Sequence, residues 1–412
     1  MRSNIPQGYK QTELGIIPED WEIMTFDELG TFSKGSGVSR AESNTGNIPC
    51  IRYGELYTHH NDYIKAYNSY ISKTVASKAK LLQYGDVLFA ASGETKEEIG
   101  KSAAFVNSCE AYAGGDIIIL STNSKLCDAK YIGYASNAPY VTKQKATKGQ
   151  GDAVVHITSE AIKTISINIP PIAEQRAIAE ALSDVDGLIA ALDKKIAKKR
   201  LLKQGAMQQL LTGKKRLPNF TDEWVEKTLG EIGTLSMCKR IFQEETSDSG
   251  DVPFYKIGTF GQEADAFISK AKYESYKNMY RFPSKGDILI SAAGTIGRTV
   301  VYDGEPAYFQ DSNIIWLAHT QKQILNIYLS YVYQIINWNI ENTTIARLYN
   351  DNFNNTVVLF PKSLVEQQAI ATILSDMDKE IADLEAQRDK YRLLKSGMMQ
   401  KLLSGQIRLK TE

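Results

Sequence analysis

Apolar residues recur at alternating intervals of four and three positions in two long segments of the chain, residues 174–217 and 366–409. This interval is the heptad pattern of a helix that packs one stripe of side chains against another helix. We expect the helix–helix seam to consist of Ile178, Leu182, Val185, Ile189, Leu192 and Ile196 in the first segment and of Ile370, Leu374, Met377, Ile381 and Leu384 in the second.

Both segments predict long helices with defined ends. Neither holds a proline after its first residues, and Gly213 and Gly405 stand where a helix should stop. About 40 residues at a rise of 1.5 Å each give a helix about 60 Å long.

The two segments are also copies of each other. Aligned without gaps, 25 of their 44 positions are identical. The regions before them repeat more faintly but in the same order: Trp21 matches Trp224, and Asp86 matches Asp287. The chain is therefore one unit written twice, a variable block of about 150 residues followed by a helix.

This duplication predicts how the helices pack. The seam of one helix needs a partner, and the other copy in the same chain supplies it. The second block begins at Trp224, just after the first helix, so antiparallel packing returns the C-terminus to the first block and relates the two copies by a pseudo-two-fold axis. We expect the boundaries to be 1–172 for the first block, 173–216 for the first helix, 217–362 for the second block, and 363–412 for the second helix and tail.

The sequence of the variable blocks predicts mixed, mostly β structure. Short apolar runs such as DVLFAAS and GGDIIIL in the first block, and DILISA and SNIIWL in the second, are separated by Gly and Asn turns. Short helices are expected in YIGYASNAPYVTKQ and IYLSYVYQIINW, where the aromatic stripe of the second is expected to be core. The predicted fold class is α+β, with two mixed, mostly β domains joined by two long antiparallel coiled-coil helices.

Composition limits the classes of function. The 48 basic and 48 acidic residues cancel, so a nucleic-acid partner would have to be met by local patches of charge. The four cysteines form no CxxC pair and the four histidines no ligand-spaced cluster, so no metal is expected. The N-terminus has no apolar signal region and no apolar run is long enough to span a bilayer, so we expect a cytoplasmic protein with reduced thiols.

The catalytic motifs that the sequence suggests are incomplete. Gly100-Lys101-Ser102 resembles the end of a phosphate-binding loop, but Thr95 stands where its first glycine belongs. Asp86 with Glu94 and Lys96 resembles a metal-dependent nuclease site, but the second copy keeps only Asp287, so both aspartates are interpreted as turn residues. Asn168-Ile169-Pro170-Pro171 differs from a methyltransferase loop by the inserted isoleucine. We therefore expect no catalytic residue and no cofactor.

Binding is the remaining interpretation. Residues 194–216 hold nine Lys or Arg and no acid, which fits either a solvated helix face or contacts to phosphates or an acidic partner. Cations recur in both blocks where Lys101 matches Arg298 and Arg52 matches Lys256, which suits backbone contacts. Stretches that differ, such as 143–151 against 339–350, suit base readout, although simple surface charge is an alternative for each residue. The candidate DNA-binding residues are Lys34, Arg40, Arg52, Lys101, Lys143, Lys145, Lys148, Lys239, Arg240, Lys256, Arg298 and Arg347.

The amino-acid sequence of the duplicated segments resembles that of a known family. EQRAIAEALSDVDGLI with LLKQGAMQQLLTGKKRL, its repeat EQQAIATILSDMDKEI with LLKSGMMQKLLSGQIRL, and the opening TELGIIPEDW resemble the specificity subunit of type I restriction-modification enzymes, over essentially the full chain.

The resemblance implies two target recognition domains, each of which reads one half of a bipartite site in double-stranded DNA, with the helices as a ruler between them. It implies as partners two methylation subunits, which carry S-adenosylmethionine and methylate adenine, and an ATP-driven restriction subunit. The chain itself would then be no enzyme. The alternative is a stand-alone sequence-specific DNA-binding regulator.

Overall fold

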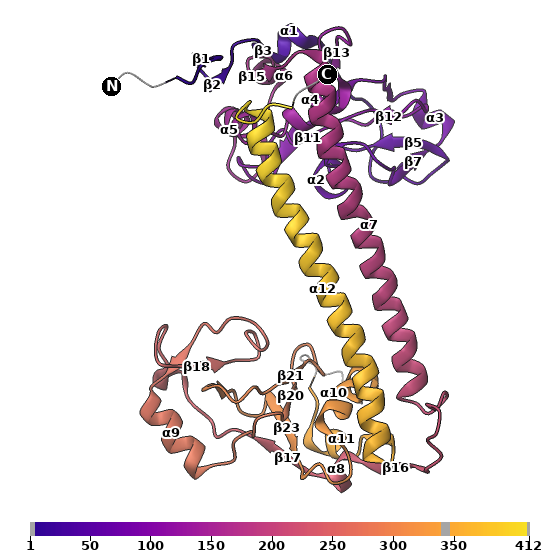
Figure 1. Cartoon of the computed structure of the whole chain (residues 1–412), viewed down its shortest axis with the longest axis vertical. Helices are drawn as coiled ribbons and strands as arrows, with labels where there is room; N and C mark the ends of the chain where they lie inside the picture. Colours follow the sequence, from indigo (N-terminus) through magenta and orange to yellow (C-terminus); the bar gives the residue numbers. More distant parts are fainter. Residues whose placement is uncertain (1–4, 339–346, 410–412) are drawn as a thin grey trace. The chain divides into compact units, whose positions relative to one another are not determined.

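The computed structural model describes residues 5–338 and 347–409. The chain divides into two compact units. Unit 1 comprises Met1–Asp193 and Gln387–Glu412, and unit 2 comprises Lys194–Ala386. The two long helices drawn in Figure 1, α7 (Ile172–Leu210) and α12 (Leu364–Leu403), each begin in one unit and end in the other. Their 39 and 40 residues confirm the helix lengths expected from the heptad pattern.

The centre of unit 1 is a five-stranded sheet. Neighbouring strands in this sheet pair antiparallel, except for β11 and β6, which pair parallel. The order is β4 (Gly30–Lys34), β13 (Ile117–Thr122), β9 (Asp86–Ala90), β11 (Ser102–Ala104) and β6 (Asp62–Tyr63).

Alternate side chains of the central strands fill two separate cores. Val87 and Phe89 belong to the core that contains helix α4 (Ala129–Ala135) and the start of α7, whereas Leu88 and Ala90 belong to a second core on the other face. Successive side chains of a strand point to opposite faces, so a strand with cores on both sides must be apolar throughout. This accounts for the uninterrupted apolar run of β9.

Unit 1 also contains a second sheet, three two-stranded pairs and several short helices. A four-stranded sheet has the order β7 (Ser69–Ile71), β5 (Ile48–Ile51), β12 (Tyr112–Ala113) and β8 (Lys80–Leu81). Two-stranded pairs are β1 (Tyr9–Thr12) with β2 (Gly15–Pro18), β3 (Glu22–Thr25) with β15 (Ser166–Ile169), and β10 (Ser92–Gly93) with β14 (Val155–His156). The short helices are α1 (Phe26–Leu29), α2 (Glu55–Thr58), α3 (Lys73–Ala76), α5 (Pro139–Lys148) and α6 (Ser159–Lys163).

Unit 2 repeats this plan with shorter sheets. The main sheet has the order β17 (Thr234–Met237), β23 (Ile314–Ala318), β20 (Ile288–Ser291) and β21 (Thr299–Val301). A second sheet has the order β19 (Phe267–Ile268), β18 (Val252–Tyr255) and β22 (Tyr308–Phe309), and β16 (Trp224–Thr228) pairs with β24 (Val357–Pro361). The helices are α8 (Leu229–Ile232), α9 (Lys270–Met279), α10 (Asn326–Ile335) and α11 (Asn350–Asn354), with a 3-10 turn at Gln243–Glu245.

The repeat in sequence is therefore a repeat in topology. In the main sheets, β17, β23, β20 and β21 take the places of β4, β13, β9 and β11. The side chains alternate in the same way, because Ile288 and Ile290 face the core with α10 while Leu289 faces the other core. The aromatic residues of α10, Tyr328 and Tyr331 among them, are buried, as expected of core residues.

Within each unit the two helices run antiparallel. In unit 1, Asp186 of α7 pairs with Lys395 of α12, and the later Asp193 pairs with the earlier Arg392. In unit 2, Lys199 pairs with Glu380 and Lys203 with Asp378, so the numbers again run in opposite directions.

The predicted seam residues lie at different depths. Ile178 and Leu182 belong to the core of unit 1, which also holds Leu402 and Leu403 of α12, and Ile370 and Leu374 belong to the matching core of unit 2. These four side chains thus pack in their unit's domain core as well as along the helices. The other seam residues are either buried, as Val185, Ile196, Ile381 and Leu384 are, or half-buried, as Ile189, Leu192 and Met377 are.

Both helices stop shortly before the expected glycines. α7 ends at Leu210 and α12 at Leu403, and the next residues lead to Gly213 and Gly405, whose φ angles are 70° and 73°. Only glycine adopts this left-handed conformation without steric strain, which is why it commonly follows a helix.

Candidate nucleic-acid interface

Lys34, the last residue of β4, and Arg40, in the loop that follows, are exposed on the surface of unit 1. The backbone of Gly114 passes so close to Gly35 that an added Cβ would lie 1.9 Å from the Gly114 carbonyl oxygen. The amide of Gly115 donates to the Gly37 carbonyl at 2.9 Å, and Val38 is held at a φ of 57°. A β-branched residue rarely adopts this conformation. The loop is therefore held in one shape by its neighbours, with the exposed Arg40 at its surface.

The matching cations of unit 2 are partly engaged. Lys239 lies over the ring of Tyr280, with its Nζ 5.3 Å from the ring centroid, and Arg240 Nε donates to the Asp311 carboxylate at 2.8 Å. The side chain of Arg240 remains 57% exposed. Both side chains remain candidates for DNA contact, but a phosphate would have to compete with Asp311 for Arg240.

The cations shared by both blocks bind their own units. Arg298 donates to the Phe260 carbonyl at 2.8 Å, and Lys101 lies 3.5 Å from the Tyr57 carbonyl oxygen. Arg52 pairs with Glu55 and Lys256 with Asp265. Each of these cations thus has a local partner, and their predicted phosphate contacts stay a prediction.

One candidate must be corrected. Lys145 of α5 is 1% exposed, and its Nζ donates to the carbonyls of Gly100 and Ser136 at 2.7 and 2.9 Å. Burial lowers its pKa to about 7. A side chain enclosed in this way cannot reach a DNA backbone, so Lys145 is a structural residue.

Other candidates near it remain accessible. Lys143 is exposed and Lys148 half-buried on the same helix, and in unit 2 Arg347 is exposed beside the bridge that it forms with Ala293. Of the stretch 339–350 that was compared with 143–151, residues 339–346 lie outside the described residues.

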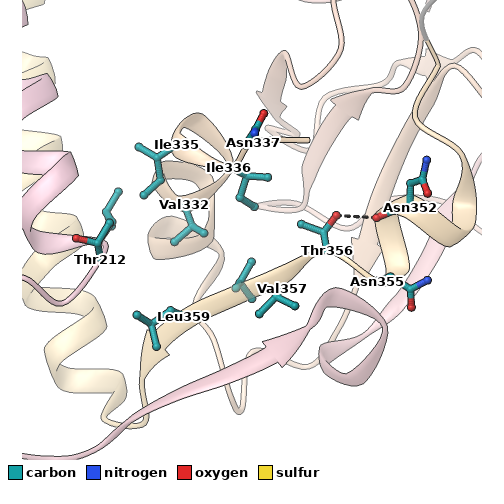
Figure 2. A pocket seen from close by; sticks show the side chains of 12 residues that line it. Thr212, Val332, Ile335, Ile336, Asn337, Asn352, Asn355, Thr356, Val357 and Leu359 are labelled. Atoms are coloured by element: carbon teal, nitrogen blue, oxygen red, sulfur yellow. Dashed lines mark hydrogen bonds between the residues drawn. The ribbon is translucent and has the colours of Figure 1, made fainter. Parts of the chain in front are cut away.

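A cavity of about 590 Å³ opens beside α10 in unit 2 (Figure 2). Figure 2 shows Val332 and Ile335 of α10, with Ile336 directly after the helix, facing Val357 and Leu359 of β24 across it. The described residues that line the cavity have apolar, amide or hydroxyl side chains, and none of them is charged. The cavity therefore does not resemble a phosphate-binding site. In unit 1 the strand equivalent to β24 is β15, and α5 lies against it. Gln144 of α5 makes two hydrogen bonds of 2.9 Å with the backbone of Ser166 in β15.

Two polar clusters, which we name clamps, recur in both units. In the tryptophan clamp of unit 1, Arg408 donates two hydrogen bonds of 2.7 Å to Glu174 and lies over the ring of Trp21, whose indole N–H also donates to Glu174 at 2.9 Å. The hydrogen bond to Glu174 is the main cause that raises the pKa of Arg408.

The tryptophan clamp of unit 2 consists of Trp224, Glu366 and Arg216. Arg216 donates to both oxygens of Glu366 at 2.7 and 2.8 Å and lies over the ring of Trp224. It differs in one respect, because the buried indole nitrogen of Trp224 has no hydrogen-bond partner within the described chain. In each unit, an arginine just beyond the end of one helix is thus tied to the first turn of the other.

The tyrosine clamp lies further along the helices. In unit 1, the hydroxyl of Tyr134 donates to Asp186 at 2.7 Å, and Lys395 bridges Asp186 at 2.8 Å and Asp62 at 2.6 Å. In unit 2, Tyr331 and Lys203 make the same contacts to Asp378.

The two tyrosine clamps differ in burial. The side chains of Asp186 and Asp378 are 9% and 44% exposed. Burial disfavours the charged form of Asp186, but hydrogen bonds from Lys395, Lys65 and Tyr134 outweigh it and lower the pKa of this carboxyl. Burial likewise opposes the charge of Lys395, but Asp62 and Asp186 raise its pKa. Unit 1 therefore holds a buried network of ionised groups where unit 2 holds a half-exposed pair.

The clamps change the interpretation of the basic run at 194–216. Four of its nine cations pair with acids of α12 inside unit 2: Lys199 with Glu380, Arg200 with Glu385, Lys203 with Asp378 and Arg216 with Glu366. Each of these four thus has a carboxylate partner within unit 2, although the side chain of Arg200 remains 63% exposed. The sequence held a signal for them, since Arg216 and Arg408, and Lys203 and Lys395, are identical in both copies although they are not seam residues.

The rejected catalytic motifs have structural roles. Asp86 accepts hydrogen bonds from the Gln83 amide and the Ser121 hydroxyl at 2.8 and 2.6 Å, and Asp287 accepts from the Ser284 amide at 2.8 Å. Both close the turn before a strand. The described residues bring together no group of three or more His, Cys, Asp or Glu that could hold a metal ion. Within the same ranges, no helix has the length and apolar character needed to cross a membrane.

Comparisons with known proteins agree on one family. A family model described as the type I restriction modification DNA specificity domain matches residues 18–199 and 221–391. A putative type I restriction enzyme specificity subunit, S.HindORF215P of Haemophilus influenzae, is 41% identical over 227 residues, which cover 54% of this chain and 58% of the relative. The putative MjaX specificity subunit of Methanocaldococcus jannaschii is 24% identical over 434 residues and matches over 98% of both chains.

Solved structures share the fold. The S subunit of a type I restriction-modification system from M. genitalium has a TM-score of 0.60 at 17% identity, over 93% of this chain and 96% of that one. A chain from a structure on complex assembly and conformational transition of the type I R-M system has a TM-score of 0.57 at 15% identity, over 95% and 99%. At these identities the similarity establishes the fold alone.

Proposed function

The chain belongs to the type I restriction-modification DNA specificity family, and from this premise we propose that it selects the DNA sequence on which a restriction-modification complex acts. Each unit reads one half of a bipartite site, and the bases between the halves are not read. The chain itself contributes no catalytic group and no cofactor.

The repetition of the clamps is the observation that carries this proposal. The tryptophan and tyrosine clamps join each variable block to both helices through the same residue types. The loops between the strands differ in sequence and length, as the segments that follow Lys34 and Lys239 do. A frame kept in two copies, with loops that differ, fits two readers of different sequences.

Recognition then divides into positioning and readout. Exposed cations such as Lys34, Arg40 and Lys143 contact phosphates and seat each unit on the duplex, whereas loop side chains contact base edges in the major groove. Because the two units are parts of one chain, binding of the first half-site raises the effective concentration of the second unit at its own half-site.

The helices have two roles in this proposal. Both α7 and α12 continue from one unit into the other, so their length determines the number of base pairs between the half-sites. They also dock two methylation subunits, which supply S-adenosylmethionine and adenine methylation, and a restriction subunit joins the assembled complex.

Mapping of methylated adenines tests the proposal. The chain is coexpressed with the methylation subunit of its own system in a host without adenine methylation, and modified positions are read across the genome. We expect one gapped, two-part motif, absent when either protein is expressed alone. A chain that binds a defined DNA sequence without the methylation subunit, and adds no methylation with it, would instead be a stand-alone regulator.

A further inference from the structure

A short turn of the same construction occurs in both units. It comprises residues 38–43 in unit 1 and 241–246 in unit 2, and the interval between the two is the one that separates Trp21 from Trp224. Each turn lies in the loop that follows the edge strand of its main sheet, β4 or β17. We name them the capped turns.

Three hydrogen bonds hold the capped turn of unit 1. The Ser39 amide donates to the Glu42 carboxylate at 2.8 Å, and the Glu42 amide donates back to the Ser39 carbonyl at 3.2 Å. The Ser43 hydroxyl donates to the Arg40 carbonyl at 2.7 Å. The bond from the Ser39 amide is also the main cause that lowers the pKa of Glu42.

The capped turn of unit 2 repeats all three hydrogen bonds. The Phe242 amide donates to the Glu245 carboxylate at 2.8 Å, and the Glu245 amide donates back to the Phe242 carbonyl at 3.0 Å. The Thr246 hydroxyl donates to the Gln243 carbonyl at 2.7 Å. Glu245 is further held by an ion pair with Lys272. Each turn is therefore fixed by its own residues and by its unit.

Burial also follows the same order in both turns. The first residue, Val38 or Ile241, is buried in a core of its own unit, the next three residues are exposed, and the last two are half-buried. The buried and half-buried positions keep their chemistry between the copies, as Val and Ile, Glu and Glu, and Ser and Thr. All three exposed positions have changed, from Ser39, Arg40 and Ala41 in unit 1 to Phe242, Gln243 and Glu244 in unit 2. The same frame thus presents different side chains.

The exposed residues of unit 2 have the chemistry of base recognition. The Phe242 side chain is 54% exposed, and because an apolar ring is unfavourable in water, a contact outside the unit would stabilise it. Gln243 is exposed at the next position. In the major groove, phenylalanine contacts the methyl group of thymine, and the glutamine amide donates to adenine N7 and accepts from adenine N6.

Exposed cations border both capped turns. Lys239 and Arg240 come directly before the turn of unit 2, and both side chains are exposed. In unit 1, the exposed Arg40 lies on the turn, and the exposed Lys78 lies beside the same loop, where its carbonyl accepts a hydrogen bond of 2.9 Å from the Ser36 hydroxyl. Cations in these places can bind phosphates on either side of a base that the turn contacts.

We propose that the capped turns lie in the major groove and that their exposed residues determine which bases each unit reads. In unit 2, Gln243 pairs with an adenine and Phe242 contacts the methyl group of a thymine. In unit 1, Ser39 takes the place of Phe242 and faces the base edges, while Arg40 extends to the adjacent phosphate. This inference rests on the proposed function and names the residues that give the two units different half-sites.

Exchange of the exposed residues between the turns tests the inference. The variant F242S/Q243R/E244A keeps the buried and hydrogen-bonding residues of its turn, so the frame is unchanged. It is coexpressed with the methylation subunit, and methylated adenines are mapped. We expect one half-site to change at neighbouring positions, with the other half-site and the gap kept. The reciprocal variant, S39F/R40Q/A41E, should change the other half-site alone.

The two proposals fail in different ways in this experiment. An unaltered motif in both exchange variants would overturn the role of the capped turns and leave the proposed function intact. A wild-type complex that methylates no gapped motif would instead overturn the proposed function itself.

Base analogues test single side chains in the assembled complex. The full chain with its methylation subunit is titrated with duplexes in which one adenine has carbon in place of N7, or one thymine is replaced by deoxyuridine, which lacks the methyl group. At one adenine the wild type should bind about fivefold more weakly, because one of two hydrogen bonds is lost. At one thymine it should bind about fourfold more weakly, because one methyl contact is lost.

The variants should lose these differences separately. Gln243→Ala should bind both forms of the adenine duplex equally, and Phe242→Ala both forms of the thymine duplex. The control is Gln262→Ala, which removes another exposed glutamine of unit 2 and should keep both differences. Turn variants that discriminate the analogues as the wild type does would overturn the inference.

Discussion

Replacement of Lys395 by methionine should destabilise unit 1 much more than the equivalent change, Lys203→Met, destabilises unit 2. Both lysines end a tyrosine clamp and both side chains are 15% exposed. The acids that they leave behind differ, because Asp62 and Asp186 are 7% and 9% exposed while Asp378 is 44% exposed.

The magnitudes follow from this difference in burial. Removing one partner of a buried ion pair leaves a desolvated charge and costs about 3–5 kcal/mol. Lys65 still pairs with Asp186 at 2.8 Å, so we expect the lower end, about 3 kcal/mol, for Lys395→Met. The half-exposed pair of Lys203 and Asp378 is partly screened by water, so we expect a cost of only about 1 kcal/mol for Lys203→Met.

Hydrogen exchange under native conditions can assign each effect to its unit. A loss of about 1.4 kcal/mol in stability quickens exchange tenfold. In Lys395→Met, the amides of β9 and β13 that exchange only when unit 1 unfolds should therefore exchange more than a hundredfold faster. The β20 and β23 amides should quicken fivefold or less in Lys203→Met. Equal effects of the two changes would refute the reasoning from burial.

Acid provides a further check on the same variant. The pKa of Asp186 is lowered in the folded protein, so its stabilising contribution is present above the unfolded pKa of about 3.9 and is lost as the pH falls below it. The free-energy difference between wild type and Lys395→Met should therefore be constant near neutral pH and narrow below about pH 4. A difference that widens on acidification would contradict the assignment of a charged Asp186.

Four other substitutions separate structural cations from DNA-binding ones. Because the pKa of Lys145 is lowered to about 7, the unfolded chain binds a proton there between pH 7 and about 10.4 that the folded chain does not. The wild type should thus gain stability over Lys145→Met from pH 7 to 9, on the order of 2 kcal/mol in urea unfolding, and parallel curves would refute this. The lysine in Arg408→Lys cannot keep both hydrogen bonds to Glu174. At this partly exposed site we expect a loss of about 1 kcal/mol in stability, so that amide hydrogen exchange at the end of α12 quickens about fivefold. Unchanged exchange would contradict the role assigned to the tryptophan clamp. Replacing Lys34 or Arg40 by alanine should reduce the slope of log K for DNA against log salt by about 0.9 each, while Lys145→Met leaves the slope unchanged. The reverse pattern would mean that the buried lysine is the one that meets phosphate.

The long helices could be predicted because their signals are local and repeated. The heptad spacing, Gly213 and Gly405 each act within a few residues, and the second copy of the segment repeats them. The apolar runs of β9 and β20 were equally readable, since both faces of these strands are covered. Antiparallel packing followed from the place of Trp224 after the first helix.

The polar contacts could not be predicted in the same way. Lys145 lies among polar neighbours in sequence, and its burial depends on Gly100 and Ser136, which come from other parts of the fold. Arg408 and Glu174 are 234 positions apart, so no local pattern joins them. Only the comparison of the two copies, where Arg216 and Glu366 recur, marks these residues as a pair.

The length of the helices offers the most direct test of the account. Seven residues inserted into both α7 and α12 at the boundary between the units, after Asp193 and after Ala386, keep the heptad pattern and add about 10 Å at 1.5 Å per residue. This length equals the rise of about three base pairs. Added base pairs also rotate one half-site around the DNA axis relative to the other, and this rotation offsets part of the added length. Methylation mapping of this variant beside the wild type should return the same two half-sites with a gap longer by about one to three base pairs. An unchanged gap, or altered half-sites, would contradict the claim that the units read sequence and the helices set the distance.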